Sequence, residues 1–297
     1  MTVSPTVLAI IVAVAALLVA CWFGAGVILY PPRMSRNDVY PEQFGLRYEK
    51  VSFKSADGVE LRGWFLPSPH GPSERRTILM CHGWGDNKGD LLKFTHYLNE
   101  KAGFNLFYFD FRSHGESGGE ITTMGFYEIR DFAAAIDYLR REKPAYLERL
   151  GVFGLSMGAA VAAMALPEHP EAKAVVLESP FTTYRRVVRQ YGWIHHHVPY
   201  WPLVWIALLF LKIRVGEPRV DEYSPLNFIK RIAPRPLLMI GGGDDRLMLE
   251  SDVRELFDAA GDPKQLWIIP GATHGKCHET GGLEYETRIA GFFSRNL

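Results

Sequence analysis

The segment GLSMG at residues 154–158 places Ser156 between glycines two positions away on either side. RLGVF, an apolar run typical of a buried strand, precedes it, and the alanine-rich AAVAAMAL, typical of a helix, follows it. Glycines at this spacing predict a turn too tight for side chains, which would hold the serine hydroxyl out of the fold. Strand, sharp turn and helix in this order are typical of a nucleophile elbow.

Three other strand-like runs end in groups that such a serine would need. TILMC is followed by HGWG at residues 82–85, RPLLMI by GGGDD at 241–245, and KQLWIIPG by ATHG, which contains His274. The carboxyl ends of parallel strands meet at one edge of a sheet, so these groups are expected to lie together. A serine nucleophile needs a histidine to take its proton, a carboxylate to orient the histidine, and N–H donors for the oxyanion. The combination predicts acyl transfer with Ser156 as the nucleophile.

The elements that position these groups alternate between strand and helix. YEKVSFKS and VELRGWFL, joined by ADG, predict an antiparallel hairpin. Buried strand patterns then recur at TILMC, FNLFYFDF, RLGVF, KAVVLES, RPLLMI and KQLWII, and helical patterns follow most of them. This alternation predicts an α/β fold with a mainly parallel central sheet and helices on both faces.

From about Tyr48 to its end, the sequence resembles the α/β-hydrolase superfamily. Within it, the chain is similar to the serine-hydrolase branch of monoacylglycerol-lipase-like and serine-aminopeptidase-like enzymes and membrane-anchored α/β-hydrolase-domain proteins. The resemblance rests on HGWGDN, FDFRSHGESGG, GLSMGA, LESPF, SPLNFIKRIAPRPLLMIGGGDD and PGATH. It implies the α/β-hydrolase fold and hydrolysis of an ester, thioester or amide through an acyl-enzyme intermediate, with no cofactor.

The resemblance also implies a role for each matching residue. Ser156 is the expected nucleophile and His274 the expected general base. The residue after HG and the residue after the nucleophile donate backbone N–H groups to the oxyanion in this family. In this sequence those residues are Trp84 and Met157.

The triad acid has two neighbouring candidates, Asp244 and Asp245. The family pattern GxxDxxxP falls on Gly242 and Asp245, with Leu249 in place of the proline. This register favours Asp245. Glu178, at the end of the preceding strand pattern, is a weaker candidate for the same role.

Several other polar residues are expected to be structural. Asp110, Arg112 and His114, in DFRSHGESGG, are expected to hold a loop near the site by hydrogen bonds. Lys88 is expected on a solvated face. The run HHH at 195–197 has no carboxylate or cysteine at ligand spacing, and so predicts a loop or lid surface rather than a metal site.

Composition excludes several classes of function. The chain has 297 residues, enough for one large α/β domain, and 33 basic and 33 acidic side chains, which give no net charge to attract nucleic acid. Three scattered cysteines, Cys21, Cys81 and Cys277, are too few for a disulfide framework. Neither CxxC nor HExxH occurs, so no metal is expected.

Residues 7–30 contain no charged side chain and consist mostly of Val, Ile, Leu and Ala. A helix of this length spans the hydrocarbon core of a bilayer. A cleaved secretory signal is the alternative, but the run is long and has no basic segment before it. LVAC, ending at Cys21, resembles a lipoprotein cleavage box, yet the apolar run continues beyond it. We therefore expect a transmembrane anchor at residues 1–30, a linker at 31–45 and a hydrolase domain at 46–297.

The orientation of this single-pass anchor is predicted from its flanking charges. No lysine or arginine precedes the apolar run, whereas Arg33, Arg36, Arg47 and Lys50 follow it. The positive-inside rule therefore favours a cytoplasmic hydrolase domain.

An insertion at about residues 182–222 separates LESPF from SPLNF, and the family resemblance implies a helical lid there. It contains WPLVWIALLFL, an apolar run too short to span a bilayer. Trp205, Leu208 and Phe210 in this run are candidates for contact with the substrate or the membrane surface. The run predicts a preference for medium or long acyl chains over acetyl.

Three functions are compatible with these patterns. The first is a serine hydrolase that cleaves acyl esters or thioesters of lipid-like substrates. A serine peptidase is the second, because the same triad hydrolyses amides. The third, a catalytically silent, membrane-anchored binding protein, predicts an incomplete triad, whereas all the expected residues are present.

Overall fold

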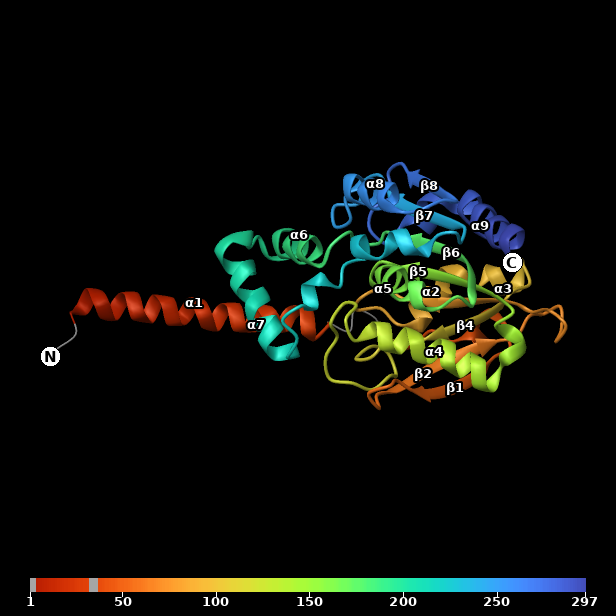
Figure 1. Cartoon of the computed structure of the whole chain (residues 1–297), viewed down its shortest axis with the longest axis horizontal. Coiled ribbons are helices and arrows are strands. Elements are labelled where there is room, and N and C mark those ends of the chain that lie inside the picture. Colours follow the sequence, from red (N-terminus) through yellow and green to blue (C-terminus); the bar gives the residue numbers. More distant parts are fainter. Residues whose placement is uncertain (1–3, 32–36) are drawn as a thin grey trace.

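The computed structural model describes residues 4–31 and 37–297, which contain one mixed sheet of eight strands (Figure 1). The strands lie in the order β1-β2-β4-β3-β5-β6-β7-β8. β2 is antiparallel to both β1 and β4, and the other neighbours are parallel, which confirms the predicted hairpin and mainly parallel sheet. The strands are β1 (Glu49–Lys54), β2 (Glu60–Leu66), β3 (Arg76–Cys81), β4 (Asn105–Phe109), β5 (Arg149–Leu155), β6 (Ala172–Glu178), β7 (Leu237–Gly242) and β8 (Lys264–Ile269).

Helices cover both faces of the sheet, as predicted. α2, α3 and α9 share one hydrophobic cluster with the sheet, and α4, α5 and α8 share the other. The helices are α1 (Pro5–Leu29), α2 (Lys88–Thr95), α3 (Tyr97–Glu100), α4 (Glu128–Glu142), α5 (Met157–Ala165), α6 (Tyr184–His196), α7 (Trp205–Val215), α8 (Glu250–Ala259) and α9 (Cys277–Asn296).

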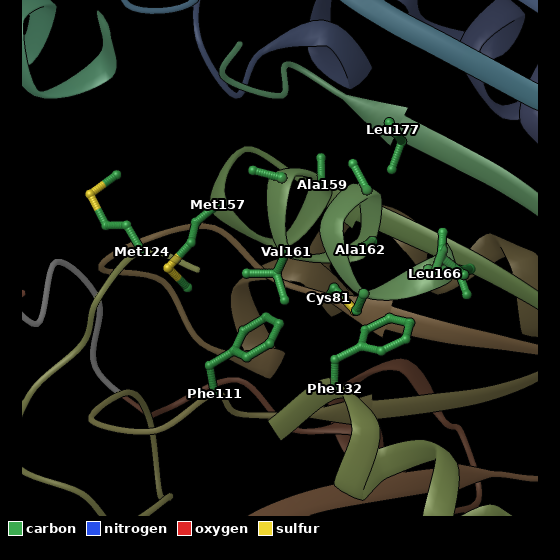
Figure 2. Packing of buried hydrophobic residues seen from close by; sticks show 14 of the residues in the cluster. Cys81, Phe111, Met124, Phe132, Met157, Ala159, Val161, Ala162, Leu166 and Leu177 are labelled. Atoms are coloured by element: carbon green, nitrogen blue, oxygen red, sulfur yellow. The ribbon is translucent and has the colours of Figure 1, made fainter. Parts of the chain in front are cut away.

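The central strands are apolar throughout because both of their faces are covered. In β3, Ile78 and Met80 face one hydrophobic cluster, whereas Leu79 and Cys81 face the other, and all four are fully buried. This is the alternation of side chains that a pleated strand imposes. Figure 2 shows Val161 of α5 pointing toward the ring of Phe111 on the second of these faces, with Phe132 beside it.

α1 projects from the hydrolase body, and most side chains along its N-terminal part are exposed (Figure 1). It is the one unbroken helix among the described residues that is long and apolar enough to cross a membrane. Its C-terminal part packs on the molecule, where Cys21, Ala25, Ile28 and Leu29 are buried.

The insertion between β6 and β7 is helical, as predicted. α6 and α7 are joined through the short helical segment η4 (Tyr200–Val204) and are bent by 116° relative to each other. α7 lies beside the C-terminal part of α1 (Figure 1). The predicted linker lies partly outside the described residues, as do Arg33 and Arg36, and its described part includes a short 3-10 turn at Pro41–Phe44.

Candidate active site

Ser156 lies at the turn between β5 and α5, with a φ of 51° and a ψ of −114°. A positive φ is unusual for a residue with a side chain. The flanking glycines make this turn possible. A Cβ on Gly154 would lie 2.6 Å from the Ala159 Cα atom, and one on Gly158 would collide with the Cys81 carbonyl group. The Ser156 N–H donates to the Glu178 carbonyl oxygen at 2.8 Å, which fixes the turn to the end of β6.

The structure places Ser156, His274 and Asp245 in hydrogen-bond contact, although they lie far apart in the sequence. Ser156 Oγ is 3.0 Å from His274 Nε2, and His274 Nδ1 is 2.8 Å from Asp245 Oδ2. A neutral imidazole that donates from Nδ1 to the carboxylate has an acceptor at Nε2 for the serine proton. The three side chains are therefore arranged to transfer a proton from the serine hydroxyl to the imidazole.

Asp245 is held in place by its own loop. Its Oδ1 accepts the backbone N–H groups of Leu247 at 2.9 Å and Met248 at 2.8 Å, which leaves Oδ2 for His274. Asp245 is buried, whereas the neighbouring Asp244 is exposed. The register that favours Asp245 therefore agrees with the position of this carboxylate beside the imidazole.

Glu178 has a different partner from the imidazole. It is fully buried at the end of β6, and its Oε2 accepts the Tyr285 hydroxyl at 2.5 Å. Burial raises the pKa of Glu178 to about 7. Since it binds Tyr285, it does not hold the position of the triad acid.

Met157 and Trp84 are the expected oxyanion donors; Met157 directly follows Ser156, and Trp84 lines the same cavity as Ser156. Met157 is the first residue of α5, so its N–H has no acceptor within the helix. Trp84 lies in the loop after β3, and its side chain lines the same cavity as Ser156 and His274. The indole Nε1 of Trp84 donates to the Ile28 carbonyl oxygen of α1 at 3.3 Å, a contact that sequence patterns did not indicate.

His82 fixes the loop that carries Trp84. Its Nδ1–H donates to the Gly83 carbonyl oxygen at 2.7 Å, and its Nε2 accepts the Phe111 N–H at 3.0 Å. Burial lowers the pKa of His82 to about 4, so the ring is neutral near pH 7 and can make both bonds. The HG motif predicted the oxyanion donor that follows it, but no sequence pattern indicated that its histidine fixes the loop through these two hydrogen bonds.

The expected solvated position of Lys88 is wrong. Only 2% of its side chain is exposed, and its Nζ lies 2.5 Å from Asp110 Oδ2 and 2.6 Å from Glu116 Oε2. The expectation failed because its partners lie 22 and 28 residues further along the chain. Burying the ammonium group is tolerated here because two carboxylates neutralise it.

The loop at residues 110–119 is held by hydrogen bonds, as expected. Asp110 accepts the N–H groups of Lys88 at 2.7 Å and Glu116 at 2.8 Å. Arg112 binds the buried Asp131 through two of its nitrogens. His114 Nδ1 donates to the Arg112 carbonyl oxygen at 2.7 Å.

A cavity of about 970 Å³ opens above Ser156 and His274. Its walls come from the loop after β7, from α6 and from the end of α1. The apolar side includes Ile28, Val187, Val188 and Ile194. This is enough room for a substrate with an apolar part beside the serine.

The candidate lid residues lie elsewhere. Leu208 is buried, Phe210 packs edge-on against Trp22 of α1 at 5.5 Å, and Trp205 is 45% exposed. None of the three lines the cavity above Ser156. His195 of the histidine run does line it, but no group of three or more metal-binding side chains was found in the described part of the chain.

The chain matches the model of a hydrolase family and is similar to known α/β hydrolases. The family model described as serine aminopeptidase, S33, matches residues 72–222. The chain is 32% identical to YqkD of Bacillus subtilis over 82% of its own length and 79% of that protein. It is 29% identical to the α/β hydrolase domain-containing protein WAV2 of Arabidopsis thaliana over 93% of its length and 88% of that protein.

Among solved structures, the chain is similar to the Pyrococcus furiosus esterase Pf2001. The TM-score is 0.73 and the identity 27%, over 89% of this chain and 98% of the esterase. Family model, relatives and fold agree: the chain is a hydrolase and belongs to the serine aminopeptidase S33 family of the α/β-hydrolase superfamily.

Proposed function

We propose that the chain is a membrane-anchored serine hydrolase that cleaves acyl ester or thioester bonds in lipid-like substrates. The observation that carries this proposal is the 3.0 Å contact between Ser156 Oγ and His274 Nε2 at the wall of a large cavity. A serine hydroxyl paired in this way is activated as a nucleophile.

In the proposed reaction, Ser156 Oγ attacks the acyl carbonyl carbon while His274 Nε2 takes its proton. Asp245 keeps the imidazole in the required tautomer and stabilises the imidazolium that forms. The N–H groups of Trp84 and Met157 donate to the oxyanion. His274 then protonates the departing alcohol or thiol, and a water molecule, deprotonated by the same imidazole, hydrolyses the acyl-enzyme.

The composition of the cavity supports an acyl group more than an aminoacyl group as the bound part. α6 and the end of α1 contribute Val187, Val188, Ile194 and Ile28. Such side chains stabilise an alkyl chain by removing it from water. The group in the cavity wall that could meet a substrate ammonium is the exposed carboxylate of Asp244, on the loop after β7. We therefore propose esters and thioesters as substrates, with aminoacyl amides as the alternative.

We expect the purified full-length chain to hydrolyse p-nitrophenyl esters with a higher kcat/KM than aminoacyl p-nitroanilides. A fluorophosphonate probe should label Ser156, as read by peptide mass spectrometry, and should block ester hydrolysis. Faster cleavage of the anilides would replace the esterase assignment with the peptidase. A chain that is neither labelled nor active would be a silent binding protein.

We also propose that α1 is retained as a membrane anchor rather than removed as a signal sequence. This proposal is supported by its packing, because Cys21, Ala25, Ile28 and Leu29 bury their side chains against the rest of the protein. Removing the whole helix would expose the apolar groups that they cover.

Cytoplasmic placement of the hydrolase domain predicts protection from external protease. The charges that favour this orientation are Arg33, Arg36, Arg47 and Lys50, because positive residues stay on the cytoplasmic side. In intact spheroplasts, added trypsin should leave a C-terminally tagged chain uncut on an immunoblot. Detergent-permeabilised spheroplasts provide the control, in which the domain should be accessible to trypsin. Digestion in intact spheroplasts would show that the hydrolase domain lies outside the cytoplasm. A shortened soluble form would show that α1 is cleaved.

A further inference from the structure

The end of α1 is part of the wall of the catalytic cavity. Ile28 lines that cavity together with Ser156 and His274. The Ile28 carbonyl oxygen also accepts the indole N–H of Trp84, whose backbone N–H is a proposed oxyanion donor. A helix that only tethered the domain would not need to contact this loop.

A second cavity, of about 280 Å³, lies between α1, α6 and the segment from Val198 to Ala207. α1 contributes Ala20, Cys21, Gly24, Val27 and Ile28 to its walls. Most of the other lining side chains are also apolar, so the space is suited to hydrocarbon rather than to a charged group.

The two cavities adjoin one another. Ile28, Val188 and Tyr191 line both of them. The ring of Tyr191 also packs edge-on against the ring of Trp84 at 5.4 Å. A chain that occupied the second cavity would therefore contact residues that also line the cavity of Ser156.

Large apolar side chains are exposed on α6, η4 and α7, the elements that line the second cavity together with α1. Trp201 is 74% exposed, and Trp193, Trp205, Leu209 and Ile213 are also exposed. An exposed patch of this kind marks a surface for a membrane or a partner. Continuity with the proposed anchor favours the membrane, because α7 packs against α1. A Cβ added at Gly24 of α1 would lie 3.9 Å from the Cβ of Ala207 of α7.

Arg214 of α7 contacts the C-terminal part of α1, which is the part closer to the hydrolase body. Its guanidinium lies 5.1 Å from the ring of Trp22 and 5.2 Å from that of Tyr30, and it donates to the Tyr30 hydroxyl at 3.1 Å. Tryptophan, tyrosine and arginine together are typical of the level of lipid headgroups. The α1 residues that line the second cavity, from Ala20 to Ile28, cover nearly the same length of the helix as Trp22 to Tyr30, so the cavity lies at the level of this boundary.

We propose that the second cavity binds the acyl chain of a membrane-resident substrate whose ester carbonyl lies at Ser156, and that α1 forms one wall of this site. The inference rests on the proposed ester hydrolysis. The small side chains at Ala20, Gly24 and Ala207 leave the space that the chain occupies. A substrate would enter from the bilayer along α1, with its alkyl chain kept out of water.

The test fills the cavity from α1 in the full-length chain, reconstituted in phosphatidylcholine nanodiscs. Ala20→Phe places a ring at the edge of the cavity. The matched control Ala16→Phe places the same ring one turn earlier on α1, where the residue does not line the cavity; both alanines are exposed. The readout is the ratio of kcat/KM for p-nitrophenyl dodecanoate to that for the butyrate. We expect Ala20→Phe to lower this ratio at least about tenfold, since each buried methylene is worth about a factor of four in binding.

A second variant covers the case in which Ala20→Phe does not fold. Ala207→Phe fills the same cavity from α7, and Ile213→Phe is its control at a position 67% exposed on that helix. A folded cavity variant with an unchanged ratio overturns the acyl-chain site, even if its kcat/KM falls by the same factor with both esters. If the wild-type chain hydrolyses no ester of any length and Ser156 is not labelled, the proposed function itself fails, a result distinct from an altered chain-length profile.

Discussion

Replacing Ser156 with alanine is expected to lower kcat for ester hydrolysis by about 10⁶, the scale measured when a triad nucleophile is removed. The structure gives the physical reason. Ser156 Oγ is the hydroxyl in contact with His274 Nε2, and the residues on either side of it in the turn, Leu155 and Met157, have no hydroxyl. Steady-state hydrolysis of p-nitrophenyl esters by the full-length variant measures the loss, and fluorophosphonate labelling should disappear with it.

Ser179→Ala is the matched control for this experiment. Ser179 is also a buried serine with a positive φ, 47°, directly after a strand. Loss of its hydroxyl should leave both labelling and kcat close to those of the wild type. Undiminished turnover in the Ser156 variant, or equal losses in the two variants, would contradict the assignment of the nucleophile.

Asp245→Asn is expected to lower kcat by about 10⁴, because the amide can no longer hold the imidazole in the required tautomer. The shape of the site should survive, since the asparagine oxygen can still accept the N–H groups of Leu247 and Met248. The amide nitrogen would then face His274 Nδ1 in place of a carboxylate oxygen. Circular dichroism and thermal unfolding check that the fold is retained while kcat is measured.

Asp244→Asn tests the register of the same loop. Asp244 is exposed, and its backbone N–H donates to the Ala272 carbonyl oxygen at 2.9 Å, an interaction that the substitution retains. Its effect on kcat should be far smaller than that of Asp245→Asn. A larger loss from Asp244→Asn would mean that the other carboxylate is the triad acid.

The sequence was informative where short-range patterns determine structure. Buried strand runs predicted the sheet, ADG predicted the hairpin, and the glycines around Ser156 predicted a sharp turn. The order of the strand ends placed Ser156, Asp245 and His274 on one edge, because parallel strands share that edge. Local pattern and topology were sufficient for these features.

Contacts between distant segments were not predictable in the same way. Lys88 was misplaced because the carboxylates that permit its burial lie on another loop. α7 is apolar on nearly every side, so its sequence gives no preferred face, and the packing of Phe210 on Trp22 depends on a helix 188 residues earlier. For the same reason, no pattern near Ile28 indicated that α1 reaches the loop of Trp84.

Ile28 lines both cavities, and Ala20 and Gly24 line the second. With the proposed anchor and acyl-chain site, α1 would therefore not be interchangeable with other membrane segments. Any sufficiently apolar stretch would keep the protein at the bilayer, yet a generic polyleucine segment would fill the space that the small residues leave. A chimera built in this way would preserve cellular location and alter substrate choice. Expressing the hydrolase domain alone, a common route to crystals, would remove one side of the site and yield an enzyme with a different selectivity.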